Sequence, residues 1–575
     1  MENKYYYNNI IAWYDFKENS KVLVLSKDNY LDEYFREKFG TKLVIIKVCD
    51  DCGYIKLNEQ KIENDYDYII MIGSYEFAPV FYNSKNPYTD LLVYLKNHLN
   101  EDGKILLTMN NKFGIKYFVG AKSKHYNTIF QSLTQTIDNT KSNLLSKNDL
   151  ISAFNEADIK NYKFFYPVPD YRSASAIFSD EFLPDETTNK LSYPIAYNDE
   201  SVILYSEVET LKQLANNNLF DKFCNSFFVE LGKKELHNDV KFVSYNNLRK
   251  DKYNFMLVIH KNIIHKYPMF PEGKLHVKNI ENNIINLKKL NFNVIDYVEN
   301  DVIFSKFVPF KTLDSIITNM IKNQKIDEAC NVIQNWYDYI KERLIVYKSE
   351  DYTEKNVFKL YNIDIDDNVL EKLNIIKMGF FDLVFENVFL DPNNQYLFYD
   401  QEWYCENVPI EYILYRAISN LYCYSENAIN QYINFDEMLK KFEIFEYKKI
   451  FSKLEKAIQN EIIDEEKYKK YVESIPKLIS LSELKKGYDD EVILRSYYYK
   501  FKDEIDNLNN NIITYNNIKQ KNEKEIEELT KSIEELTKKN EEDSKNFEEL
   551  KMKYDSIINS TWYKVIKKFI KIKND

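Results

Sequence analysis

The stretch FDLVFENVFLDPNNQYLFYDQEW, residues 381–403, has the pattern of a hairpin with polar ends. Two apolar runs, 388–390 and 396–399, flank a polar turn, and this pattern predicts two antiparallel strands. Three oxygen-bearing side chains stand at the ends of these runs: Asp382, Asn387 and Asp400. Because the two open ends of a hairpin lie together, we expect these side chains to converge. The alternative is an ordinary hairpin whose polar ends have no function.

Phosphoryl transfer from a nucleotide requires such a set of side chains. One carboxylate orients or deprotonates the attacking hydroxyl group, while an amide oxygen and a second carboxylate bind the magnesium ion that neutralises the phosphates. We therefore expect Asp382 to act on the acceptor hydroxyl, and Asn387 and Asp400 to bind Mg²⁺. The phosphoryl donor would be ATP.

The same motif resembles the catalytic and metal-binding loops of the protein-kinase-like superfamily. The pattern D-L-x-x-x-N followed by D-x-E is similar to that of its small-molecule branch, the aminoglycoside and choline kinases, and Glu402 occupies the last position. The resemblance implies an α+β bilobal domain, and Glu402 as a further metal ligand or an anchor of the loop. Phe381 departs from the family because His or Gly usually precedes the aspartate.

The preceding residues fit the smaller lobe of such a domain. Strand-like runs occur at 240–245, 253–260 and 263–267, and a helical stretch follows at 276–290. The resemblance implies that Lys266 contacts the nucleotide phosphates and that Glu281, on the helix, holds this lysine. We expect this lobe to span 186–310 and a helical lobe to span 311–500.

Residues 1–185 alternate strand-like runs with helical segments, which is the pattern of a doubly wound α/β domain. The expected strands are 21–26, 42–48, 66–73 and 104–109, and Asp102-Gly103 reads as the turn before the last of them. Ligands of such sheets bind at the carboxyl ends of the strands. Four residues lie there and are candidates for cofactor contacts: Ser26, Gly73, Glu76 and Asn110.

Three segments of this half, 66–79, 103–121 and 165–184, resemble class I S-adenosylmethionine-dependent methyltransferases with a Rossmann-like fold. The subgroup in question serves bacterial surface-polysaccharide and flagellin-glycan biosynthesis. The resemblance implies S-adenosyl-L-methionine as a cofactor. The sequence departs from the family because the first strand runs into Ser-Lys-Asp-Asn instead of a glycine-rich turn. A methyltransferase-like scaffold that only positions its neighbour is the alternative.

The last part of the chain is predicted to mediate contacts. Residues 501–558 carry apolar side chains at most heptad a and d positions from Ile505 onward, which predicts a coiled coil and a homodimer, with folding back onto the body as the alternative. Residues 559–575 form a short, basic, amphipathic tail. Such a tail can touch an anionic membrane surface or a partner protein, and it resembles the tails of surface-glycan glycosyltransferases.

Composition narrows the function classes. The net charge of −12 argues against nucleic acid as the main partner. We expect neither a signal peptide nor a membrane-spanning segment, and the six scattered cysteines fit a reducing cytoplasm. The ten glycines form no G-x-G motif, so a phosphate or cofactor loop must work without one.

The combined prediction is a cytoplasmic, bifunctional protein of surface- or flagellar-glycan biosynthesis. One half phosphorylates a small hydroxyl compound, a sugar or a hydroxy amino acid, and the other methylates the same or a related compound. The alternatives are a non-catalytic scaffold with two degenerate modules, and a protein in which only the methyltransferase half is active.

Overall fold

The computed structural model describes residues 9–184, 205–344, 346–347 and 355–474, except 28, 30, 51, 52, 55, 122, 124–129 and 140. Beyond these it describes 501–502, 504–505, 507–519, 521, 523, 551–556, 560–562 and 564–565. The chain divides into two compact units, Met1–Ile479 and Ser480–Asp575. Within the described residues, no helix is both long and apolar enough to cross a membrane.

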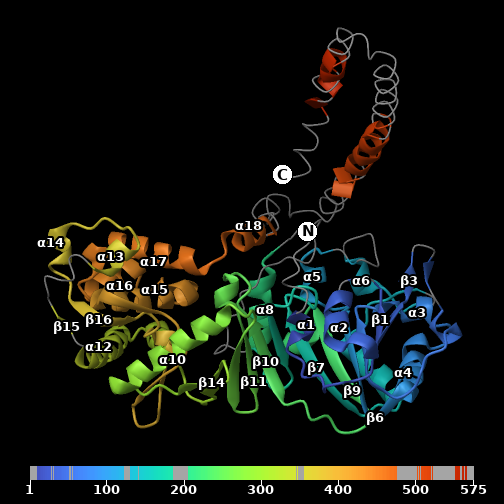
Figure 1. The fold of residues 1–575 in the computed structure, drawn as a ribbon, viewed down its shortest axis with the longest axis horizontal. Helices are drawn as coiled ribbons and strands as arrows, with labels where there is room; N and C mark the ends of the chain where they lie inside the picture. Colours follow the sequence, from blue (N-terminus) through green and yellow to red (C-terminus); the bar gives the residue numbers. More distant parts are fainter. Residues whose placement is uncertain are drawn as a thin grey trace, which may run out of the picture. The chain divides into compact units, whose positions relative to one another are not determined.

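The first half is a parallel sheet covered by helices, as the sequence predicts (Figure 1). Its parallel strands are β2 (Leu43–Lys47), β1 (Val22–Ser26), β5 (Tyr66–Ile72) and β6 (Leu99–Asn110), in that order across the sheet. Both faces of this sheet are buried, which is why its strands are nearly continuous apolar runs. Its helices are α1 (Asn9–Ala12), α2 (Asp32–Phe39), α3 (Ala78–Phe81), α4 (Pro87–His98), α5 (Ile115–Phe118), α6 (Gln131–Thr134) and α7 (Lys147–Glu156).

One expectation for this half was wrong in detail. Asp102-Gly103 does not form a turn before β6 but lies within it, at a register shift in the pairing with β5. The sheet also continues beyond residue 185, the boundary expected from the sequence. The helices α8 (Glu207–Asn216) and α9 (Phe220–Phe223) lead into β9 (Ser226–Gly232), which inserts between β6 and β7 (Asn161–Val168), antiparallel to both. The first sheet therefore needs residues up to 232.

The second half continues the same sheet. Strand β8 (Ala176–Ser179) pairs with β10 (Val240–Tyr245), so that twelve strands of the described chain form one hydrogen-bonded sheet. Figure 1 shows it passing into the green strands. The following antiparallel strands are β11 (Phe255–His260), β12 (Ile263–Pro268), β14 (Val302–Lys306) and β13 (Asp296–Glu299). Helix α10 (Gly273–Lys289) follows β12, as predicted for the smaller lobe.

The larger lobe is mainly helical around one apolar core. Its principal helices are α11 (Leu313–Lys322), α12 (Ile326–Arg343), α15 (Ile410–Ile429), α16 (Phe435–Lys441) and α17 (Lys448–Ile462). The strands are β15 (Val346–Tyr347), β16 (Ile375–Phe380), β17 (Val388–Leu390), β18 (Tyr396–Phe398) and β19 (Tyr404–Pro409). Short helices complete it: α13 (Val357–Leu360), α14 (Asp367–Leu370) and α18 (Glu465–Ser474). A short hairpin in the first half consists of two strands of two residues each, β3 (Cys49–Asp50) and β4 (Gly53–Tyr54).

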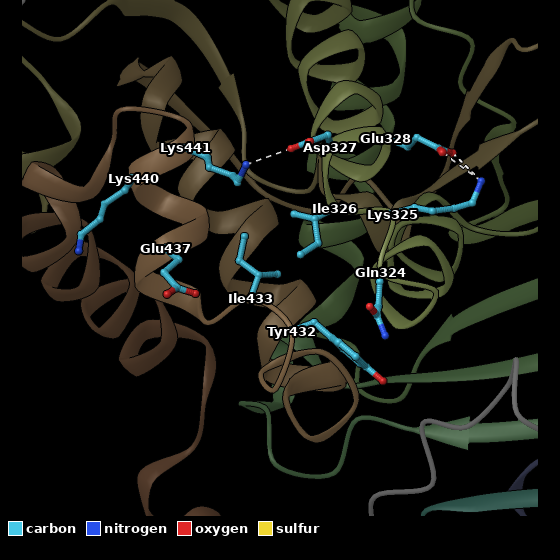
Figure 2. Close-up of a pocket in the computed structure, with 10 residues that line it drawn as sticks. All are labelled: Gln324, Lys325, Ile326, Asp327, Glu328, Tyr432, Ile433, Glu437, Lys440 and Lys441. Atoms are coloured by element: carbon cyan, nitrogen blue, oxygen red, sulfur yellow. Dashed lines mark hydrogen bonds and ion pairs between the residues drawn. The ribbon is translucent and has the colours of Figure 1, made fainter.

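A cavity of about 870 Å³ opens at the surface of the larger lobe, between the start of α12 and α16 (Figure 2). Four of its charged side chains form two ion pairs, Lys441 with Asp327 at 3.2 Å and Lys325 with Glu328 at 3.0 Å. It contains none of the residues that the sequence marks as site candidates.

The coiled-coil prediction lies mostly outside the described residues. Residues 507–519 are helical, and so are 551–556, whereas 524–550 are not described. Most of the basic tail, 566–575, is likewise outside the described part. The homodimer and the membrane contact stay predictions.

The position of β9 gives a testable prediction about domain boundaries. A fragment 1–185 lacks β9, which leaves the facing edges of β6 and β7 unpaired, whereas a fragment 1–239 retains it. We expect a cooperative thermal transition, followed by circular dichroism, for 1–239 and none for 1–185. Equal cooperative unfolding of both fragments would show that β9 is dispensable to the first sheet.

Candidate functional site

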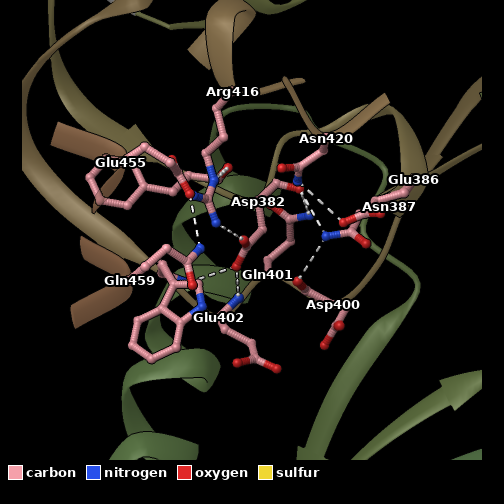
Figure 3. Close-up of polar contacts among 12 residues, drawn as sticks. Asp382, Glu386, Asn387, Asp400, Gln401, Glu402, Arg416, Asn420, Glu455 and Gln459 are labelled. Atoms are coloured by element: carbon pink, nitrogen blue, oxygen red, sulfur yellow. Dashed lines mark hydrogen bonds and ion pairs between the residues drawn. The ribbon is translucent and has the colours of Figure 1, made fainter. Parts of the chain in front are cut away.

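The hairpin brings Asp382, Asn387 and Asp400 together. Strands β17 and β18 pair antiparallel, with Val388 opposite Phe398. The side-chain amide of Asn387 donates to the carbonyl oxygens of Asp382 and Asp400, at 3.3 and 3.4 Å (Figure 3). Both bonds use the amide nitrogen of Asn387, and among the described residues no hydrogen-bond donor contacts its amide oxygen.

Lys266 lies beside this hairpin. It comes from β12, in the smaller lobe, and is buried. Its ammonium group donates to Asp400 Oδ1 at 2.5 Å and also contacts Glu402 Oε1. Burial lowers the pKa of this lysine, but the two carboxylates outweigh it and hold the pKa above its ordinary value. Lys266 is therefore charged, and this charge joins the two lobes.

Glu402 binds cations with both of its carboxylate oxygens. Oε1 contacts Lys266, and Oε2 accepts a hydrogen bond from Arg249 Nη1 at 2.6 Å. The side chain is only 3% exposed. Burial raises its pKa, but Arg249 and Lys266 hold the pKa well below its usual range. Both oxygens are engaged by cations, which fits the anchoring role, one of the two roles that the resemblance implies for Glu402. The metal role stays a prediction.

Glu281 does not hold Lys266. It lies on the exposed face of α10, because the buried positions of this helix include His276, Ile280 and Asn283, and Glu281 falls outside that stripe. Asn283 Nδ2 donates to the carbonyl oxygens of Gln401 and Glu402 at 3.2 and 3.1 Å. The helix thus holds the Glu402 segment through Asn283, and Glu402 takes the place that the sequence assigned to Glu281.

Asp382 is buried and faces the interior of the larger lobe. Its Oδ2 accepts from the backbone N–H groups of Glu402 and Trp403, at 2.8 and 3.0 Å. Its Oδ1 lies 3.6 Å from Arg416 Nη2, and Figure 3 shows the carboxylate turned toward that guanidinium. Burial raises the pKa of Asp382 to about 7, against the opposing effect of Arg416. In this conformation Asp382 braces the Glu402–Trp403 backbone.

Arg416 supports this bracing from α15. Its guanidinium bonds to Glu455 at 2.5 Å and to the carbonyl oxygen of Phe381 at 3.0 Å. Glu455 lies on α17, and no local sequence pattern connects that helix to α15. The interaction was missed because it depends on how the two helices pack.

Asp400 is the most accessible acidic group of the site, with a side chain 42% exposed. Its backbone is in the left-handed region (φ 56°), and its N–H donates to Asp296 Oδ2 at 2.6 Å. Asp296, on β13, is buried, and burial raises its pKa to about 6. Sequence reasoning missed Asp296, although an aspartate at the start of an apolar strand was a usable signal.

The donor set at this position fits Mg²⁺. Asp400 supplies a carboxylate and Asn387 an amide oxygen, and magnesium usually takes one or two protein ligands together with water and phosphate oxygens. Among the described residues, no three His, Cys, Asp or Glu side chains form a metal-binding group. Lys266 contacts Asp400, so a phosphate group at this position would reach both the ammonium group and a metal ion bound by Asp400.

In the first half, Glu76 and Asn110 meet at the ends of β5 and β6. Glu76 Oε1 accepts from the N–H of Asn110 at 2.5 Å and from its side-chain amide at 3.0 Å. Lys116 then bridges Asn110 Oδ1 at 2.6 Å and the buried Asp170 at 3.0 Å. Ser26, at the end of β1, accepts from Lys47 at 3.1 Å. Glu76, Asn110 and Ser26 thus each form hydrogen bonds with other residues of the first half.

The space beside Gly73 is filled by Tyr171. Gly73 has a φ of +68°, and a Cβ atom there would lie 2.4 Å from the Tyr171 hydroxyl oxygen. The cavity between the ends of β1 and β5 measures only about 10 Å³. In this arrangement a group that approaches Gly73 from its Cβ side meets the Tyr171 ring, and we derive no step through S-adenosylmethionine.

No protein-family model and no curated protein matches the sequence. The chain is similar to solved structures of two kinds. A methyltransferase from Thermotoga maritima is 10% identical, with a TM-score of 0.21 over 40% of this chain and 88% of that one. The choline kinase of Streptococcus pneumoniae is 16% identical, with a TM-score of 0.19 over 38% of this chain and 89% of that one. A macrolide 2'-phosphotransferase is 12% identical, with a TM-score of 0.22 over 48% of this chain and 99% of that one. We draw no functional conclusion from scores at this level.

The anchoring role of Glu402 predicts a large loss of stability in Glu402→Gln. The substitution leaves Arg249 and Lys266 without their buried partner, which costs on the order of 3–5 kcal/mol in comparable sites. Glu281→Gln is the matched control, because that side chain is exposed, and we expect its unfolding free energy to change by less than about 0.5 kcal/mol. Urea unfolding of both variants measures the difference. Equal stabilities would rule out the anchoring role.

The raised pKa of Asp382 predicts a pH-dependent difference between the wild type and Asp382→Asn. Between the ordinary value of 3.8 and about 7, the folded protein keeps a proton that the unfolded chain releases. The wild type therefore loses stability as pH rises through this window, and the variant lacks this loss. We expect the melting temperature of the wild type, relative to the variant, to fall from about pH 4 to pH 7 and to level off above. A difference independent of pH would contradict the shift.

Proposed function

We propose that residues 205–474 bind a magnesium–nucleotide complex and transfer its terminal phosphoryl group to a hydroxyl group of a small molecule. The observation that carries this proposal is the 2.5 Å contact between Lys266 and Asp400, next to the braced amide of Asn387. A buried ammonium group beside an accessible carboxylate and an amide oxygen is the arrangement that phosphates and magnesium require together.

Each residue has a separate task in this proposal. Lys266 binds phosphate oxygens, and Glu402 with Arg249 keeps that lysine in place. Asp400 and Asn387 would hold Mg²⁺, which neutralises phosphate charge when bound. The hydrogen bond from Asp400 to Asp296 fixes the backbone from which the carboxylate projects. Glu281 has no part.

The catalytic role expected of Asp382 stays a prediction. Its carboxylate accepts two backbone hydrogen bonds and lies near Arg416, so orienting an acceptor hydroxyl requires it to rotate away from these partners. Methyl transfer by the first half stays a prediction, and Tyr171 lies against Gly73 in this structure. The glycan setting that the sequence resemblance implies also stays a prediction.

Calorimetric titration with ATP, with and without Mg²⁺, tests the proposal on three proteins: the wild type, Asp400→Ala and Glu281→Ala. We expect magnesium-dependent binding by the wild type and by Glu281→Ala. Asp400→Ala should bind at least about tenfold more weakly, because the nucleotide loses its metal ligand. Phosphate release or transfer is then measured on the proteins that bind.

Two results would count against this function. If the folded wild type binds no Mg·ATP, the second half is a scaffold, the non-catalytic alternative. If Asp400→Ala binds as tightly as the wild type, the nucleotide site lies elsewhere.

A further inference from the structure

A cavity of about 420 Å³ lies on the other side of Glu402 from Lys266. One wall is α10, and the opposite wall is the segment from Glu402 to Tyr404. The end of α17 closes it with Ile458, Glu461 and Ile462. Glu402, the anchor of Lys266, lines this cavity, but none of the residues proposed to bind the nucleotide or the metal does.

The wall formed by α10 is rich in side-chain amides. Asn279, Asn282, Asn283 and Asn286 follow at helical spacing, so they share one face of the helix. Asn283 is buried and holds the backbone at Gln401 and Glu402. Among the described residues, the other three amides have no side-chain hydrogen-bond partner. Each offers both donors and an acceptor to the cavity.

The remaining walls combine aromatic rings with hydroxyl groups. Tyr253 and Trp403 pack edge to face, with ring centroids 4.7 Å apart. The hydroxyl groups of Tyr253 and Tyr361 donate to the two oxygens of Glu461, at 3.4 and 3.3 Å. His276, buried beneath them, has an Nε2 atom without a hydrogen-bond partner, 3.7 Å from Glu402 Oε2. Apolar rings with a few convergent polar groups are typical of small-molecule sites.

The charges that line the cavity select against anions. Its described lining includes two carboxylates, Glu402 and Glu461, and neither lysine nor arginine. Glu402 is neutralised from outside the cavity by Lys266 and Arg249, and Glu461 already accepts from two tyrosines. Neither carboxylate therefore requires a cationic ligand. Amides in this number match a neutral compound that carries several hydroxyl groups.

We propose that this cavity is a binding site for a neutral polyhydroxy compound, a sugar. The asparagine amides bond to its hydroxyl groups, and the rings of Tyr253 and Trp403 cover its apolar faces. The binding itself does not depend on phosphoryl transfer. That this sugar is the acceptor of the reaction would rest on the proposed function, and the experiment below measures binding alone.

The test uses the intact chain without nucleotide and three matched probes at pH 6.5: neutral D-glucose, anionic D-glucuronate and cationic D-glucosamine. Saturation-transfer NMR titrations give the affinities. We expect saturable glucose binding, with glucuronate at least about tenfold weaker. The double variant Asn279→Ala/Asn282→Ala, which alters two exposed side chains, should weaken glucose binding by at least about tenfold. Glu281→Ala, on the same helix but outside the cavity, should bind glucose like the wild type.

Several results overturn the proposal. These are the absence of saturable glucose binding, equal binding by the double variant, and glucuronate binding as tight as that of glucose. Glucosamine binding that exceeds that of glucose and persists in the double variant would show a cation site instead. Mg·ATP titration of the same samples reports separately on the phosphoryl-transfer proposal, so that the failure of one is distinguishable from the failure of the other.

Discussion

The buried carboxylate of Glu402, held between Lys266 and Arg249, is the interaction on which the second half depends. Glu402 follows the hairpin of the larger lobe, whereas Lys266, on β12, and Arg249, after β10, belong to the smaller lobe. Three charges leave water together, so each is tolerated only because the others are present. The pairing fixes Lys266 beside Asp400, and the backbone bonds of Asp382 and Asn283 to the same segment fix Glu402.

Local pattern was enough to predict much of the fold. The strands 240–245 and 388–390 have the bounds expected from their apolar runs, because turn residues on both sides end each run. The closeness of Asp382, Asn387 and Asp400 also followed from the hairpin, since all three lie within one short segment.

Contacts between distant segments could not be predicted in this way. Glu402 replaces Glu281 because the rotation of α10 about its axis depends on the whole core that the helix covers. Arg416 meets Glu455 only through the packing of α15 on α17. Strand β9 enters the first sheet from beyond the expected boundary, and no local feature of residues 226–232 identifies β6 and β7 as its neighbours. In each case the missing information was tertiary.

The pairing of β8 with β10 restricts how the smaller lobe can move relative to the first domain. Hydrogen bonds across a sheet resist hinge motion, so the smaller lobe is carried by the first domain as part of a single rigid platform. Relative movement of the two lobes would then be movement of the larger lobe against this platform. The first domain would thus support the smaller lobe through backbone hydrogen bonds, a contribution that requires no chemistry of its own.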